Sequence, residues 1–364
     1  MECKKDQIYG QLKRAIMDET LPPGSRLPTE KQLSKSLTVG QVTLRSALAR
    51  LEAEGLVERI RSRGTFVTQR SRRKVFLLIQ PDGTENLETP SRYIAAGLEE
   101  CAEKYYVTLE ICPESLFIAC SPEERAEIIR AHSISGIVLE TGHRMVSPKV
   151  MNAVKELELP VVIPHGTDDD ISEGVMLLQT NEKQAFKDAY LYLAEHGHKK
   201  IASLFLFLPG ESREKFRGFS DGELPEFLQK NDLSDSCALI SRIDNLLDEI
   251  REQVKKWMSL PEPPTAVLCH SDRVAMRVCA VLREMDLKVP EDVSVMGYSN
   301  YPGGQLLLPP LTTIDTRLKE CAAIALEKLL DFNSWYDKDK IPEIVFTPYS
   351  LIERGSIAHK NKGK

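Results

Sequence analysis

Residues 22–67 read PPGSRLPTEKQLSKSLTVGQVTLRSALARLEAEGLVERIRSRGTFV, and this stretch decides the fold of the N-terminal part of the chain. The prolines and the glycine of its first seven residues exclude a continuous helix and predict an extended approach. Thr29 is a good N-cap, and Leu33 and Leu37 are four residues apart. We therefore expect a short helix over residues 30–37.

A second helix is expected from Gln41, because Leu44, Leu48 and Leu51 recur at the spacing of one buried helical face. Gly55 is well placed to end this helix. Two short strands, residues 56–60 and 65–67, then flank the sequence Arg-Ser-Arg-Gly. A helix, a turn, a second helix and a basic hairpin in this order are typical of a winged helix-turn-helix.

Three polar residues, Gln41, Thr43 and Arg45, lie off the apolar stripe near the start of the second helix. Helix-turn-helix proteins contact base edges and phosphates from this position. An arginine-rich hairpin tip suits a minor groove or a phosphate. A small helical domain with merely solvated charges is the alternative, and it accounts less well for the agreement of order, spacing and charge.

The segment from Ile8 to Val67 resembles the DNA-binding domain of the GntR family. The matching motifs are PGxxLPTE at 23–30, VTLRxAL at 42–48, LExEGLV at 51–57 and GTFV at 64–67. The resemblance implies double-stranded DNA as a partner. It places Lys31, Gln41, Thr43 and Arg45 at DNA-contacting positions, and Arg61, Arg63 and Gly64 in the wing. The chain departs from the pattern at Gly40, where the family usually has a Ser or Thr that caps the helix and contacts phosphate.

The charge is distributed unevenly along the chain. Residues 1–74 hold 16 Lys and Arg against 8 Asp and Glu, a net charge of +8. The remaining residues hold 32 against 46, a net charge of −14, so the overall −6 conceals a basic head on an acidic body. This asymmetry is typical of a nucleic-acid-binding module joined to a carrier domain.

Length and composition limit the remaining possibilities. A chain of 364 residues should form two or three domains, and 42% hydrophobic with 28% charged residues is ordinary for a globular protein. No apolar run is long enough for a membrane span, and the N-terminus lacks the apolar stretch of a secretory signal. The eight cysteines show no metal-ligand spacing and are expected to be reduced. We expect a cytoplasmic protein with a DNA-binding domain at 1–68, a linker at 69–74, a larger domain at 75–358 and a tail at 359–364.

From Val75 onward, short apolar strands alternate with amphipathic helices. Strands are expected at 75–79, 107–111, 136–139, 160–163, 201–208, 239–240, 266–269 and 293–297, with helices near 91–104, 122–131, 148–156, 181–195, 245–258 and 272–285. This rhythm predicts an α/β fold with doubly wound parallel sheets. It runs through the chain twice and so predicts two lobes, with ligands bound at the carboxyl ends of the strands.

This larger region resembles the effector domain of LacI/GalR-type repressors, which is itself similar to periplasmic sugar-binding proteins. The matching pieces include HGHKKIA at 196–202, RGF at 217–219, PTAVLCHSDxxA at 264–275, VPEDVSVMGY at 289–298 and PLTTI at 310–314. A GntR head on such a body is the arrangement of arabinose-repressor-type regulators. The resemblance implies a repressor that releases DNA when a sugar closes the cleft between the lobes.

Several positions depart from the sugar-binding pattern of that family. Lys215 stands where the family has an arginine, Ser299 where it has an aspartate, and Ser271 where it has an asparagine. A point charge replaces a bidentate guanidinium, and a strong carboxylate acceptor is lost. These departures argue against a plain monosaccharide, and the resemblance as a whole implies a sugar or a sugar derivative as the effector. Candidate lining residues at the strand ends are Asp82, Glu140, His165, Lys215, His270, Asp272, Ser299 and Asn300; a solvated loop role is an equal alternative for each, and Asp272 can also be a helix cap.

The sequence favours no catalytic, cofactor or metal site. His196 and His198 surround a helix-ending glycine, and the aspartates at 168–170 fit a solvated loop. No phosphate loop, nucleophile elbow or HExxH motif is present. An aminotransferase-fused regulator would need a longer body with a Schiff-base lysine, and a periplasmic transport component would need a signal peptide.

A homodimer is expected, because one winged helix reads only one half-site of a palindromic operator. By resemblance, the dimer surface lies on the larger domain. The expected mechanism is that ligand closes the lobes, changes the dimer geometry and moves the heads out of register with the half-sites.

Overall fold

The computed structural model describes residues 4–17, 20–53, 56–60, 63–68, 74–82, 90–141, 146–206, 219–220, 222–243 and 247–360. The chain divides into two compact units, Met1–Val75 with Tyr106–Thr108, and Phe76–Tyr105 with Leu109–Lys364. Within the described ranges, no helix is long and apolar enough to cross a membrane.

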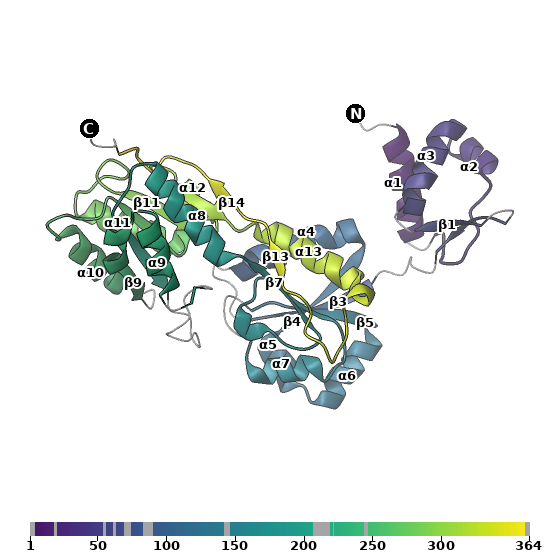
Figure 1. Ribbon diagram of the computed structural model, residues 1–364. Helices are drawn as coiled ribbons and strands as arrows, with labels where there is room; N and C mark the ends of the chain where they lie inside the picture. The colour runs from purple at the N-terminus through teal and green to yellow at the C-terminus, as the bar shows by residue number, and fades with distance from the viewer. Residues whose placement is uncertain are drawn as a thin grey trace. The chain divides into compact units, whose positions relative to one another are not determined.

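The described residues of the smaller unit form three helices and a hairpin: α1 (Lys4–Met17), α2 (Glu30–Ser36), α3 (Gln41–Ala53), β1 (Val57–Ile60) and β2 (Gly64–Val67) (Figure 1). Thr29 and Gln32 form a reciprocal capping box that starts α2. The predicted stripe Leu44, Leu48 and Leu51 is buried with residues of α1 in one core. The predicted helix-turn-helix and wing are confirmed, and the arrangement leaves the opposite face of α3 exposed.

The larger unit contains two six-stranded sheets, each of which forms one lobe. The first sheet has the strand order β13-β7-β6-β5-β3-β4 and the second β14-β12-β11-β10-β8-β9. Every pair for which a register is defined is parallel except β12 with β14, which is antiparallel. The doubly wound parallel architecture predicted from the alternating pattern is confirmed.

The first lobe is built mainly from the first half of the unit. Its elements are β3 (Lys74–Gln80), α4 (Pro90–Tyr105), β4 (Val107–Pro113), α5 (Glu114–Ala119), α6 (Pro122–Ala131), β5 (Ile134–Leu139), α7 (Pro148–Lys155), β6 (Val161–Ile163) and β7 (Val175–Thr180), together with the late α13 (Leu318–Leu330) and β13 (Val345–Thr347). Figure 1 shows α4 and α13 on one side of the sheet and α6 and α7 on the other. Four consecutive buried residues, 76–79, show that β3 is covered on both faces.

The second lobe follows the same plan. Its elements are α8 (Glu182–Glu195), β8 (Ile201–Leu206), α9 (Glu223–Lys230), β9 (Ile240–Ile243), α10 (Leu247–Met258), β10 (Ala266–Cys269), α11 (Asp272–Glu284), β11 (Ser294–Tyr298), α12 (Pro302–Gln305), β12 (Thr312–Asp315) and β14 (Ser350–Ile352). Successive side chains of β8 and β10 alternate between two hydrophobic cores. Ile201 and Leu268 pack with α8 and α9, whereas Ala202 and Val267 pack with α10 and α11. The sheet is therefore covered by helices on both faces.

Three segments join the lobes, because α13 and β13 return to the first lobe after β12 has completed most of the second. The crossings lie between β7 and α8, between β12 and α13, and between β13 and β14. Two crossings touch: the hydroxyl groups of Thr180 and Thr347 are 3.3 Å apart and buried. The hydroxyl group of Tyr349 also donates to Asp188 of α8 at 2.7 Å.

Several elements were absent from the sequence prediction. β7 was missed although its residues are apolar, since a short apolar run does not distinguish strand from helix. β13 and β14 have three residues each and lie at sheet edges, where alternation is weak. Residues 207–208 of one predicted strand, residues 245–246 of one predicted helix and Gly55 lie outside the described residues. His359 and Lys360, assigned from sequence to a tail, contact the turn at His196: the two His rings are 4.2 Å apart, and the Lys360 amide donates to the His196 carbonyl at 2.8 Å.

Candidate functional site

The N-terminal turn of α3 presents polar side chains on a rigid support. Gln41 and Arg45 are exposed and Thr43 is half-buried, whereas Leu44 is fully buried and fixes the helix against the core. The amide of Leu44 donates to the carbonyl of Gly40 at 3.1 Å, so Gly40 occupies the N-cap position without a side chain to cap the helix. This turn can approach a ligand closely.

Arg45 is held in place by the preceding helix. Its Nε donates to Oε2 of Glu30 at 2.7 Å, and this hydrogen bond raises the pKa of the guanidinium above its ordinary value. Lys31, the next residue of α2, is exposed. The charged end of Arg45 is thus oriented rather than freely rotating, which lowers the entropic cost of placing it on a base or a phosphate.

The wing is a regular antiparallel hairpin in which Ile60 faces Gly64 and Val57 faces Val67. Arg63 is exposed at its tip, and Arg61 lies outside the described residues. Gly64 has a φ of +115°, and a Cβ there would come within 2.8 Å of the Arg26 Nε. Glycine therefore allows the exposed guanidinium of Arg26 to lie against the wing. Sequence reasoning missed Arg26, because this proximity exists only after the hairpin has folded.

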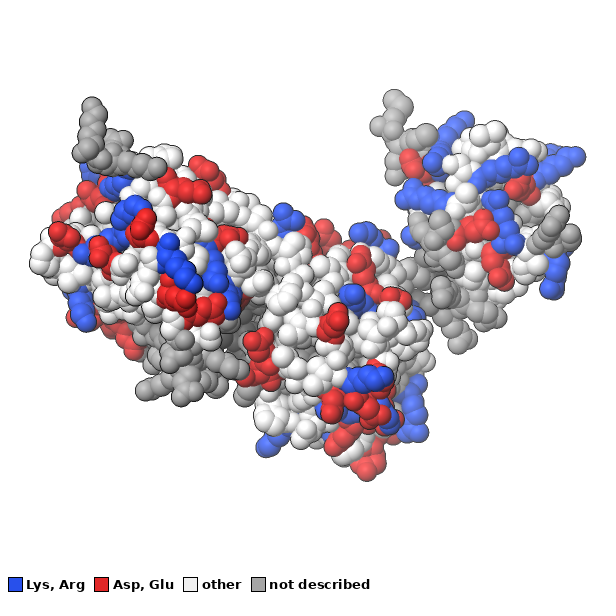
Figure 2. Space-filling model, in the orientation of Figure 1, with Lys and Arg blue, Asp and Glu red and all other residues white. Residues whose placement is uncertain are grey.

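The charge pattern is visible on the surface. On the face drawn in Figure 2, the smaller unit displays more Lys and Arg than Asp and Glu, whereas the larger unit carries Asp and Glu interspersed with Lys and Arg. This agrees with the opposite net charges of the two parts of the sequence. A basic surface attracts polyanions over a range of about 10 Å at moderate salt concentration.

In the larger unit, the predicted effector residues follow the carboxyl ends of neighbouring strands. In the first lobe, Asp82, Glu140 and His165 follow β3, β5 and β6, which are adjacent in the sheet. In the second lobe, His270 and Ser299 follow β10 and β11, which are paired in parallel. Lys215 lies outside the described residues. Each lobe thus collects polar side chains at one edge of its sheet, as the topology predicts.

The three first-lobe residues differ in their surroundings. Asp82 is exposed and accepts hydrogen bonds from the amide and hydroxyl groups of Ser115 at 3.0 and 2.7 Å, which ties it to the start of α5. Glu140 and His165 are 3% and 7% exposed. His165 has a φ of +59°, a left-handed conformation that few non-glycine residues adopt. The chain therefore turns sharply where β6 ends.

His270 lies among aromatic rings. Its ring centroid is 6.3 Å from those of Phe186 and Tyr298, with interplanar angles of 25° and 13°. Ser299 is 7% exposed, has a φ of +99°, and donates from its amide to the carbonyl of Ile314 at 2.7 Å. The loop after β11 is therefore fixed by the neighbouring strand β12.

The carboxyl oxygens of Asp272 form hydrogen bonds within the protein. Its side chain is fully buried and accepts hydrogen bonds from the Thr313 hydroxyl at 2.6 Å and the Tyr301 amide. Burial raises the pKa of the carboxyl to about 7. A Cβ at Gly297 would lie 2.1 Å from Oδ1, so glycine is required for this close approach. The cap of α11 is instead Ser271, whose hydroxyl accepts from the Val274 amide at 3.3 Å.

Three further contacts near this loop were not predicted from the sequence. Asn300 donates to Asp315 at 3.1 Å and accepts from Arg354 at 2.6 Å, which joins the loop to a segment more than 50 residues later. The rings of Tyr93 in α4 and Tyr301 are stacked with centroids 5.3 Å apart. This stack joins the first lobe to the second, and no local pattern in the sequence pairs these tyrosines.

The histidine pair considered as a metal site has a structural explanation. His198 is fully buried, its Nδ1 lies 2.9 Å from the Thr265 hydroxyl and its Nε2 lies 3.0 Å from the Ala358 carbonyl. Burial lowers its pKa to about 4. Among the described residues, no group of three or more His, Cys, Asp or Glu could hold a metal ion.

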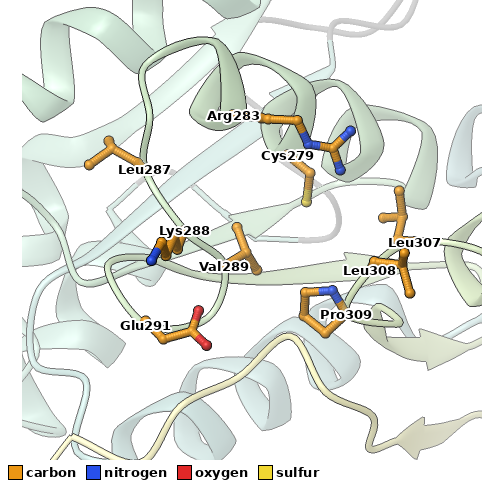
Figure 3. A pocket seen from close by; sticks show the side chains of 9 residues that line it. All are labelled: Cys279, Arg283, Leu287, Lys288, Val289, Glu291, Leu307, Leu308 and Pro309. Carbon is orange, nitrogen blue, oxygen red and sulfur yellow. The ribbon is translucent and has the colours of Figure 1, made fainter.

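A pocket of about 300 Å³ opens on the second lobe, away from the strand ends that carry the predicted effector residues. Figure 3 shows its lining from α11, from residues 287–291 and from residues 307–309. The lining is largely apolar, with Arg283, Lys288 and Glu291 as its charged members. Leu308 of this lining is 87% exposed, and the adjacent Leu306 is 83% exposed. An apolar pocket beside exposed leucines is unusual for a surface that contacts only water.

Comparison with protein families assigns the two ends of the chain separately. Residues 4–67 match the gntR family of bacterial regulatory proteins. Residues 190–357 match the periplasmic binding protein-like domain, so the first lobe lies largely outside this match.

Individual proteins extend the likeness to the whole chain. The arabinose metabolism transcriptional repressor of Geobacillus stearothermophilus is 26% identical over 375 aligned positions, covering 96% of this chain and 97% of that protein. The transcriptional repressor CytR of Escherichia coli K12 is 33% identical over 144 positions, 40% of this chain and 41% of that protein. A lac repressor dimer bound to operator and an anti-inducer aligns with a TM-score of 0.60 at 17% identity, covering 79% of this chain and 95% of that one.

Proposed function

We infer that this chain, which joins a GntR-type helix-turn-helix domain to a LacI-type periplasmic-binding-protein-like domain, represses transcription from a palindromic operator under control of a small molecule. It is a transcription regulator and not an enzyme. The observation that carries the proposal is the exposed polar turn of α3, fixed by a buried leucine stripe and joined in one chain to a two-lobed body.

The DNA-binding role is assigned to α3, the start of α2 and the wing. Gln41, Thr43 and Arg45 read base edges or phosphates in the major groove, and the Glu30 carboxylate orients Arg45. Lys31, Arg61, Arg63 and Gly64 contact the DNA backbone or the minor groove. Arg26 is added to this set, because it is exposed and lies against Gly64.

The effector is proposed to be a sugar or a sugar derivative, bound at the carboxyl ends of the strands. The named function of the full-length relatives, arabinose metabolism, supports a carbohydrate. Asp82, Glu140, His165, Lys215, His270 and Ser299 are the proposed contacts. Asp272 is assigned a positioning role instead, since its carboxylate anchors the loop that carries Ser299.

A homodimer is proposed, with its interface on the second lobe. Leu308 at the wall of the apolar pocket and the adjacent Leu306 are both exposed, so protruding leucines and a pocket lie on the same surface. A twofold axis pairs such a surface with itself, so each leucine knob enters the partner's pocket. A dimer supplies the two heads that a palindrome requires.

The proposed mechanism uses the three crossings between the lobes. A ligand that contacts both lobes favours a closed arrangement, and the stack of Tyr93 on Tyr301 is one of the contacts between the lobes that closure alters. Closure changes the dimer geometry and moves the two heads out of register with the half-sites. The proposed organisation is a DNA-binding domain at 1–68, a linker at 69–74, an effector domain at 75–358 and a tail at 359–364, in a cytoplasmic protein without a cofactor.

The test begins with a DNA fragment from the region upstream of the gene. Purified protein should shift a palindrome within it, with an affinity that falls steeply as salt concentration rises. A thermal-shift screen of sugars, sugar acids and sugar phosphates should yield a compound that raises the melting temperature, since such a compound binds the folded state. That compound should weaken operator binding; equal affinity with and without it would exclude allosteric release.

A further inference from the structure

Val42, the second residue of α3, is exposed in a position that packing does not explain. Its side chain is 83% exposed, and it is the one exposed large hydrophobic residue among the described residues of the smaller unit. The apolar residues that follow on the same helix, Leu44, Ala47 and Leu48, are at most 1% exposed. Val42 thus lies off the stripe that joins α3 to its core.

The valine contributes little to the helix itself. A β-branched side chain loses rotamer freedom in a helix, and alanine, lysine or glutamine would be more favourable at an exposed position. Isolated surface valines are common in proteins. Val42, however, lies in the first turn of α3 between the exposed polar residues Gln41 and Arg45.

The space around this turn is open. A Cβ built on Gly40, two residues before Val42, meets no atom within 4 Å. The N-cap therefore adds no bulk, and the first turn can come close to a partner surface. The side chains of residues 41, 42 and 45 then reach that surface together, two of them polar and one apolar.

In the major groove, thymine is the base whose edge carries a methyl group, and apolar side chains recognise it by direct contact. Resting on the proposed binding of DNA by α3, we propose that Val42 packs on the 5-methyl group of one thymine in each half-site. Val42 is then a specificity-determining residue, which selects thymine over cytosine at that position. Gln41 and Arg45 supply hydrogen bonds to neighbouring base edges or phosphates.

The experiment uses the full chain and a duplex selected from a random-sequence pool at low salt concentration. Each thymine of the enriched palindrome is replaced in turn, in both half-sites, by deoxyuridine, which removes only the methyl group. Burial of one methyl group corresponds to roughly 3- to 10-fold in affinity per site. We expect one symmetry-related thymine pair to show such a loss with the unmodified protein.

Variants assign this loss to the side chain. Val42→Ser should bind the thymine and deoxyuridine duplexes within about twofold of each other, because the apolar contact is gone. Val42→Thr retains the shape and one methyl group and should keep part of the preference. Leu116→Ser, at a 60% exposed leucine of α5, is the matched control and should keep the full preference. Circular dichroism spectra of all variants should coincide, since the residues are exposed.

Three results overturn the inference. If no duplex is enriched, the proposed DNA binding fails and the inference fails with it. If a duplex is enriched but no thymine is sensitive to deoxyuridine, only the assignment of Val42 is refuted. If a sensitive thymine is equally sensitive with Val42→Ser, another residue reads the methyl group.

Discussion

Arg45 in the smaller unit and Asp272 in the larger unit are both ionisable residues near the N-terminal ends of helices, and both are candidate site residues. Arg45 is exposed, and its Nε donates to the carboxylate of Glu30. Asp272 is fully buried, and its oxygens accept from Thr313 and Tyr301. A charged side chain near the start of a helix thus remains available to a partner where it meets solvent, and supports the fold where it meets a second strand.

The two units differ in the same way as these two residues. The smaller unit has its core on one side of α3 and exposed polar residues on the other, so that the residues proposed to contact DNA are already accessible. In the larger unit, the residues at the strand ends are mostly buried and linked to loops. We infer that the head is preformed, whereas the body must open or close to admit its ligand.

The largest effect is expected from breaking the proposed dimer, which would separate the two heads. Leu308→Glu places a charge on the apolar surface and should convert the protein to a monomer. Loss of the second head should weaken operator binding by roughly 10² to 10⁴-fold. Sedimentation velocity and fluorescence anisotropy measure the two effects. Phe346→Glu, at a 57% exposed residue of β13, is the control; a Leu308→Glu protein that remains dimeric would refute the interface.

Arg45→Ala tests the head alone. It removes the oriented guanidinium and should weaken operator binding by roughly 10- to 100-fold, with effector binding unchanged. Arg14→Ala, at an exposed arginine of α1, should change affinity by less than about threefold. If Arg45→Ala also abolished effector binding, the residue would have to be structural.

Asp272→Asn tests the body through its pH dependence. The pKa of Asp272 is raised to about 7 in the folded state, above its unfolded value, so its contribution to stability is full at low pH and is lost as pH rises through 7. Between pH 6 and 8.5 the wild type should lose about 1 to 1.5 kcal/mol from this group. Denaturant unfolding at these pH values should show that loss in the wild type and not in Asp272→Asn. Parallel pH curves would contradict the assignment.

Gly40→Ser is expected to give the smallest effect, because it only supplies the capping side chain that α3 lacks. The position has open space around it, and serine supplies the missing acceptor at the N-cap of α3. Replacement of glycine by serine at an N-cap should raise the free energy of unfolding by a few tenths of a kcal/mol, about 0.3. Chemical denaturation of the isolated variant and wild type under identical conditions measures the difference. A loss of stability would show that the backbone conformation at residue 40 requires glycine.

The sequence predicted most of the head, because its signals are local: the spacing of Leu44, Leu48 and Leu51, the cap at Thr29 and the basic hairpin lie within one stretch. The alternation of strands and helices predicted the architecture of the body. The return of α13 and β13 to the first lobe depends on contacts between distant residues, and no local pattern encodes it.

The site was predicted less completely, because it also depends on contacts between distant residues. Strand ends were identified correctly, but the internal role of Asp272 depends on the absence of a Cβ at Gly297, 25 residues later. Arg26 approaches Gly64 only in the folded hairpin, and Tyr93 meets Tyr301 only after both lobes have formed. The residues that fix a site are therefore harder to predict than those that line it.

The path of the chain between the lobes has a consequence for synthesis on the ribosome. The first lobe lacks its edge strand β13 until residue 347 has been made, whereas the helices and hairpin of the smaller unit end at Val67. Because domains fold as their residues emerge, the nascent chain carries a finished head while the first lobe still exposes the edge of β7. A stop between residues 181 and 344 leaves that edge open, so it is expected to produce an aggregation-prone body rather than a smaller regulator.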